Sequence, residues 1–111
     1  MMTQMYYVFG KDIKNPGVLD NIFHNVASDI MTLEVYGSFT GEISIEGRVD
    51  KNNENFSPIS GINIGDFSIA NPIVSTGIFQ YSIDGLRDIR VNVKSISGSA
   101  NITAKITSSA E

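Results

Sequence analysis

Apolar and polar residues alternate along three runs near the end of the chain, at residues 79–83, 88–94 and 100–107. Successive side chains of a β-strand point to opposite faces, so a period of two predicts three strands, each with one buried and one solvent-facing side. Residues 84–87 and a later Ser/Gly segment are predicted to form the turns between them. The side chains expected to build the core share one parity: Phe79, Tyr81, Ile83, Ile89, Val91, Val93, Ile102 and Ile106.

The same alternation runs through residues 31–50, interrupted by a glycine-bounded segment at residues 37–41. We predict one strand on each side of that segment and a chain-reversing turn within it. In the second of these strands Ile43, Ile45 and Val49 are expected to face the core.

The N-terminal segment contains a short aromatic run, and residues 1–16 are predicted to form either an arm or a first strand and its loop. A free arm would expose Tyr6, Tyr7 and Phe9 to water. We therefore expect the segment to pack against the protein's own sheet or against a neighbouring subunit, which makes these three residues candidate partner contacts.

Residues 18–30 fit two patterns. Leu19, Ile22, Phe23 and Val26 lie on one stripe of a helix. The alternative is an irregular strand near the start of the segment. Asparagine and β-branched residues lower the helix propensity, so the strand is favoured, while the helix stays open.

Turn signals divide the chain at intervals of roughly 8–12 residues, including a polar loop at residues 50–55 and Pro58. This spacing predicts an all-β fold, an antiparallel β-sandwich of the jelly-roll or immunoglobulin-like type with about seven or eight short strands. The sandwich domain is expected to cover residues 17–107, with residues 108–111 as a flexible tail.

Composition narrows the class of partner. The 111 residues fit one domain, the absence of cysteine rules out disulfides and zinc–thiolate sites, and the net charge of −4 weakens a nucleic-acid interpretation. The sequence contains neither an apolar run of about 20 residues nor the features of a signal peptide. We therefore expect no nucleic-acid partner, no membrane partner and assembly inside the cell that makes the protein.

Few residues suggest catalysis or metal binding. His24 is the only histidine, and as a general base it would need a hydrogen-bonding partner that the sequence does not reveal. Asp50, Asn52 and Glu54 alternate as calcium ligands can, but the glycine and final glutamate of a calcium-binding loop are missing. We expect no enzyme activity, no metal and no cofactor.

The densest basic cluster consists of Arg87, Arg90 and Lys94, with Asp84 and Asp88 among them. The simplest interpretation is a solvated strand face with exposed ion pairs, each worth about 0–1 kcal/mol. The functional alternative is contact with an acidic neighbour through Arg87 and Arg90.

The order of motifs resembles one protein family. Val-Leu-Asp at residues 18–20 precedes LEVYGSFTG and ISIEGRVD, and then come Phe-x-Pro-Ile-x-Gly at residues 56–61 and GIFQYSIDGLRDIR at residues 77–90. Over roughly residues 17–107 the chain resembles the small β-sandwich modules in structural proteins of tailed-bacteriophage virions. Members of that family often carry tryptophan where this chain has Phe56.

The resemblance implies a non-enzymatic virion protein with no active site. Capsid decoration through contacts with the major capsid or another virion protein is the first expectation, with self-association into a homo-oligomer such as a trimer. The alternative is a tail, fibre or baseplate component that binds host-surface glycans, which would need an exposed Tyr36, Phe39 or Phe56.

Overall fold

The computed structural model describes residues 2–109 and contains only strands and loops in that range. The ambiguous residues 18–30 form no helix. The favoured prediction of a strand holds only in part, because two strands of two residues each, at residues 17–18 and 23–24, lie there in place of one irregular strand. No helix of the described residues is long and apolar enough to cross a membrane. The strands are β1 (Met2–Ile13), β2 (Gly17–Val18), β3 (Phe23–His24), β4 (Ile30–Arg48), β5 (Ser57–Pro58), β6 (Gly61–Asn63), β7 (Ile69–Ala70), β8 (Gly77–Ser82) and β9 (Asp88–Ser109).

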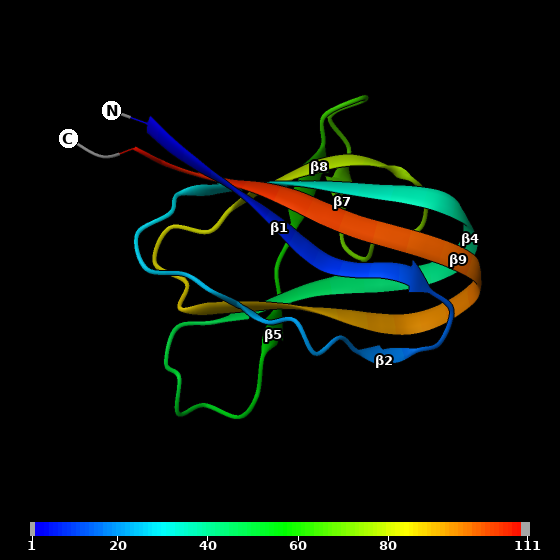
Figure 1. The fold of residues 1–111 in the computed structure, drawn as a ribbon, viewed down its shortest axis with the longest axis horizontal. Helices are drawn as coiled ribbons and strands as arrows, with labels where there is room; N and C mark the ends of the chain where they lie inside the picture. Colours follow the sequence, from blue (N-terminus) through cyan, green and yellow to red (C-terminus); the bar gives the residue numbers. More distant parts are fainter. Residues whose placement is uncertain (1, 110–111) are drawn as a thin grey trace.

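Two long antiparallel strands, β4 and β9, organise the fold. They pair along almost their whole length, from Ile30 opposite Thr107 to Arg48 opposite Asp88. Both strands bend in the middle, so the sheet folds over into two facing layers (Figure 1). The upper layer has the order β1-β9-β4-β8-β6-β7, and the lower layer adds β2 and β3 to β9 and β5 to β4. The predicted all-β antiparallel sandwich is confirmed.

The predicted turn at residues 37–41 is wrong, as is the Ser/Gly turn before residue 100. At both places the chain bends within one strand, so that four expected short strands are two strands of 19 and 22 residues. Glycines make the bends possible: Gly37, Gly41 and Gly98 have φ values of 122°, 148° and 95°. A Cβ atom on Gly41 would lie 2.1 Å from the Ser95 carbonyl oxygen, so the two bent strands approach more closely than a side chain allows.

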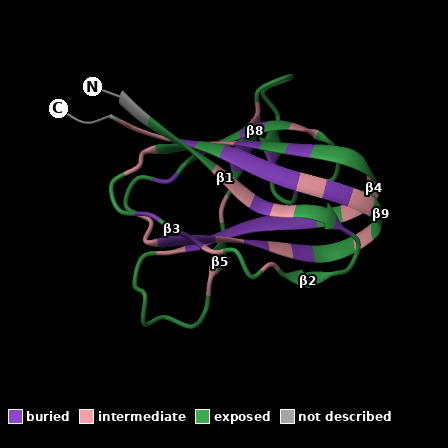
Figure 2. Ribbon diagram, viewed as in Figure 1, coloured by how far each residue is buried: buried purple, intermediate pink, exposed green. Residues whose placement is uncertain are grey.

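The core lies between the layers (Figure 2). The eight side chains predicted to build it from residues 79–106 are all at most 2% exposed, which confirms the strand phase. Ile43 and Ile45 are buried as expected, but Val49 is 70% exposed. The prediction for Val49 is wrong because β4 ends at Arg48, before the alternation does.

The two ends of the described chain pair with each other. β1 pairs with β9 from Met2 opposite Ser109 to Ile13 opposite Ala100, so the N-terminal segment is a strand of the protein's own sheet. Ser108 and Ser109, expected in a flexible tail, continue β9, while residues 110 and 111 lie outside the described residues.

Candidate interaction surface

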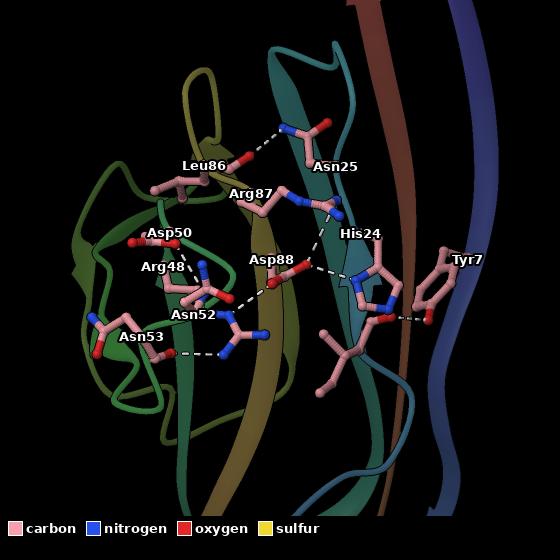
Figure 3. Close-up of polar contacts among 11 residues, drawn as sticks. Tyr7, His24, Asn25, Arg48, Asp50, Asn52, Asn53, Leu86, Arg87 and Asp88 are labelled. Atoms are coloured by element: carbon pink, nitrogen blue, oxygen red, sulfur yellow. Dashed lines mark hydrogen bonds and ion pairs between the residues drawn. The ribbon is translucent and has the colours of Figure 1, made fainter.

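A buried carboxylate gathers charged side chains on the outer face of the lower layer (Figure 3). Asp88 begins β9, with His24 of β3 opposite on one side and Arg48 of β4 opposite on the other. His24 Nδ1 lies 2.6 Å from one carboxylate oxygen of Asp88, and Arg48 Nε donates to the other at 2.7 Å. Arg87 Nη1 lies 4.0 Å away, and the Asp88 side chain is only 1% exposed.

Opposing effects set the pKa of this carboxyl group. Burial raises the pKa of Asp88, but the hydrogen bonds and charges of His24 and Arg48 outweigh it and hold the pKa below the ordinary value. Asp88 is therefore ionised at neutral pH although it is buried. The expected solvated face is wrong at this position, because β3 and Arg48 cover the carboxylate.

The turn before β9 is fixed by a buried asparagine. The Asn25 side-chain amide donates to the carbonyl oxygens of Ile83 and Leu86, at 3.1 Å each. Its backbone N–H donates to the Arg87 carbonyl oxygen at 2.7 Å. These bonds hold the turn of residues 84–87 in place and so aim Asp88 at its partners.

A second buried carboxylate lies two residues along the same face. Glu46 is 4% exposed and accepts hydrogen bonds from Arg90 Nε at 2.8 Å and from Asn92 Nδ2 at 3.2 Å. The Phe56 ring covers this part of the face, with the guanidinium carbons of Arg48 and Arg90 at 4.5 and 4.1 Å from its centroid. Cation–π contact and mutual shielding make these ion pairs stronger than exposed ones.

His24 and Arg48 share the Asp88 carboxylate. A buried carboxylate next to an exposed imidazole resembles part of a catalytic triad, but Arg48 binds the same carboxylate. Within residues 2–109 nothing hydrogen-bonds the other ring nitrogen of His24, and no group of three potential ligands is placed to hold a metal ion. Asp50 caps its own loop by accepting a bond from the Asn52 backbone N–H at 2.9 Å.

The candidate contacts of the N-terminal segment separate by parity. Tyr6 points outward and is 58% exposed, whereas Phe9 is 2% exposed within the core. Tyr7 packs edge-on against Phe9 and Phe23, and its hydroxyl donates to the Ile22 carbonyl oxygen at 2.9 Å. Phe9 and Tyr7 thus serve the protein's own packing, and only Tyr6 offers a ring to a partner.

Arg87 and Arg90 lie far from Tyr6, on the lower layer. Arg90 is bound to Glu46, and the Arg87 side chain is 41% exposed beside Asp88. The five candidate contact residues therefore do not form one surface.

The sequence interpretation missed an apolar surface at the other end of the upper layer. We call residues 61–70, which comprise β6, β7 and the turn between them, the apolar hairpin. The turn of the apolar hairpin, drawn in green beside β7 and β8, projects above the upper layer (Figure 1). One signal was available: Asp66 is the only charged residue among residues 55–83. The most exposed apolar side chains of the apolar hairpin are Phe67 at 80%, Ile69 at 76%, Ile62 at 48% and Ile64 at 42%, and Val74, which follows the hairpin, is 60% exposed.

A shallow groove of about 230 Å³ crosses the outer face of the upper layer. β1, β9, β4 and β8 each contribute to it. We call it the outer groove. The residues that line it are Tyr6, Thr32, Glu34, Ile78, Thr103, Ala104 and Lys105.

Comparisons with known proteins identify the fold. No family model matches the chain, and no curated protein matches it in sequence. The solved structure of the SPBc2 prophage-derived protein YomS is similar, with 22% identity and a TM-score of 0.88 over 97% of this chain and 96% of that one. The PBSX exported protein XepA is similar with 18% identity and a TM-score of 0.86, over 96% of this chain but only 38% of XepA. The chain shares the fold of both proteins, and matches about two-fifths of XepA.

Proposed function

We propose that this chain is a non-enzymatic bacteriophage protein that acts by binding other protein surfaces. The observation that carries the proposal is the likeness in fold, over nearly the full length of both chains, to a prophage-derived protein. The chemistry of the surface supports it. The two buried carboxylates are occupied by internal ion pairs, whereas large apolar side chains of the apolar hairpin are exposed.

The more specific role that we propose is a virion structural protein that decorates the capsid. Both layers bury their apolar faces against each other, which leaves only the outer faces, the strand edges and the apolar hairpin for contacts. Such a protein needs a protein partner, the major capsid protein or another virion protein, and no cofactor. Decoration is also consistent with self-association, because capsid surfaces repeat by symmetry.

Glycan binding by a tail or fibre protein is the weaker candidate. The Phe56 ring lies against Arg48 and Arg90, so it is not free to stack on a sugar. Of the three rings expected to bind glycans, Tyr36 is the most exposed, at 37%. XepA is an exported protein of PBSX, so a third possible location of this chain is outside the cell that makes it.

Fractionation of induced phage lysates tests the proposal. An epitope-tagged chain is expressed from its own phage, and heads, tails and free protein are separated on a density gradient. We expect the tag in the head fraction at a fixed ratio to the major capsid protein. Recovery with tails only would favour the tail role, and recovery only as free protein would refute a virion role. Val26→Ser, which alters a side chain that is 94% exposed on the lower half of the molecule, serves as the matched control.

A further inference from the structure

The turn of the apolar hairpin holds a phenylalanine in an unfavourable backbone conformation. Phe67 has a φ of 62°, in the left-handed region that glycine and asparagine adopt readily and bulky residues rarely adopt. Its side chain is 80% exposed, so the ring gains little from the protein's own core. A strained and largely exposed aromatic residue contributes little to the stability of the monomer, and this points to a role in binding.

Hydrogen bonds within the turn hold its backbone in this conformation, which would limit the entropy lost on binding. Phe67 N–H donates to the Asn63 carbonyl oxygen at 2.7 Å, and the Asn63 side chain accepts from Gly65 N–H at 2.8 Å. Asp66 accepts from the backbone N–H and the hydroxyl of Ser68, at 2.9 and 2.6 Å. The ring is thus presented on a preorganised support.

The charge near Phe67 favours a binding site on a protein over a lipid surface. Helices and loops that bind anionic membranes carry lysine or arginine next to their apolar residues. Residues 55–83 contain neither, and their one charge, Asp66, is negative. The hydrogen bonds from Ser68 lower the pKa of Asp66, so the carboxylate stays ionised at neutral pH.

The outer groove of a second copy has the matching features. Its exposed apolar side chains are Tyr6 and Ile78. The groove carries one charge of each sign: Lys105 lies opposite Tyr6, and Glu34 lies opposite Ile78. Lys105 makes no ion pair or side-chain hydrogen bond within the described residues, so an acidic partner is matched at the Tyr6 side of the groove. Phe67 is not among the residues that line the outer groove of its own molecule. The outer groove is therefore free to receive Phe67 from another molecule.

We propose that Phe67 of one molecule inserts into the outer groove of a second copy, with Asp66 next to Lys105 of that copy. The contact joins two different surfaces, so it is heterologous: each molecule uses its hairpin on one neighbour and its groove on another. Such contacts produce a closed ring or an open filament. The inference deepens the proposed function by defining how copies contact one another.

Two variants with complementary defects test this contact by sedimentation velocity on the purified chain. Phe67→Asn removes the ring and suits the left-handed backbone, so it should melt no lower than the wild type. Tyr6→Ser combined with Lys105→Glu removes the aromatic ring and reverses the positive charge of the outer groove. Both side chains are exposed, so the fold should be retained. We expect wild type to associate with increasing concentration, and each variant to weaken association by at least about tenfold. The two variants mixed should form a 1:1 pair, because one keeps a hairpin and the other keeps a groove.

A charge exchange provides rescue. Asp66→Lys alone and Lys105→Glu alone should each weaken association, and the double variant should recover most of it. Val26→Ser is the control for removing an exposed apolar side chain.

Several results would overturn the inference: a wild type that stays monomeric, a Phe67→Asn variant that associates like wild type, or variants that do not pair when mixed. Phe67-dependent cosedimentation with phosphatidylcholine–phosphatidylglycerol vesicles, with the protein monomeric, would assign the ring to lipid instead. A monomeric chain that still fractionates with phage heads would refute this contact and leave the proposed function standing.

Discussion

Replacing Asp88 by asparagine removes the charge at the centre of the lower layer while keeping nearly the same shape. The Arg48 guanidinium, bound to Asp88 at 2.7 Å, then loses its counterion although its side chain is only 17% exposed. Breaking a fully buried pair costs about 3–5 kcal/mol. Arg48 keeps its hydrogen bond to the Asn53 carbonyl oxygen, and the His24 side chain is 64% exposed, so we expect a smaller loss, about 2 kcal/mol. With an unfolding entropy of about 2.1 cal/mol/K per residue, this lowers the Tm by roughly 9 °C.

Thermal melts of wild type and Asp88→Asn at a series of pH values measure the effect and its origin. The pKa of Asp88 is lowered in the folded protein, so its ionised form stabilises the fold above the unfolded pKa of about 3.9. That contribution is lost as the pH falls through the folded pKa. The difference in Tm between the two proteins should therefore be full at pH 7 and shrink below about pH 4.

Asp84→Asn is the matched control, because Asp84 is exposed in the turn four residues earlier. It should change stability by less than about 0.5 kcal/mol. A loss for Asp88→Asn as small as that of the control would refute the stabilising role of the ion cluster. A Tm difference that persists unchanged at pH 3 would show that the charge is not its source.

Three further substitutions test the packing. Tyr81→Phe should raise the free energy of unfolding by about 1 kcal/mol in urea denaturation, because the Tyr81 hydroxyl is buried and has no hydrogen-bonding partner within residues 2–109. Gly41→Ala should lower it by about 3 kcal/mol, since the new Cβ would lie 2.1 Å from the Ser95 carbonyl oxygen at a φ of 148°. Phe56→Ala should cost about 1–2 kcal/mol by exposing the two arginine ion pairs, and 1 M salt should weaken this variant more than wild type. A neutral Gly41→Ala, a destabilised Tyr81→Phe or a salt-insensitive Phe56→Ala would contradict the corresponding contact.

The alternation of side chains predicted which residues form the core but not where strands end. Parity is a local property of an extended chain, so Ile89 and Ile102 were correctly assigned to the core although a bend separates them. A glycine with positive φ serves a reversing turn and a bent strand equally well. The sequence around Gly41 and Gly98 therefore did not distinguish two short strands from one long one, because the answer depends on the pairing of β4 with β9.

The candidate site was harder to predict, because burial of an outward-facing side chain depends on distant segments. Asp88 has the parity of a solvent-facing residue, and it is buried because β3 lies across it from more than sixty residues earlier in the sequence. For the N-terminal segment, parity alone separates Tyr6 from Tyr7 and Phe9, and the structure agrees with that division. Phe67 lacked a local signal of this kind, since its exposure and its backbone conformation emerge only from the folded hairpin.

The two outer faces of the sandwich differ in what a partner would have to displace. On the lower layer, Arg90 is already bound to Glu46 at 2.8 Å, so a partner that recruited it would compete with an internal ion pair. On the upper layer, Lys105 makes no ion pair within the described residues and the Phe67 side chain is 80% exposed, so a partner that buried them would not have to break an internal ion pair. Binding energy is therefore more readily obtained at the outer groove and the apolar hairpin than at the arginines of the lower layer. For this reason we expect Arg90→Ala to reduce the stability of the fold, and Phe67→Asn to reduce association while leaving the fold intact.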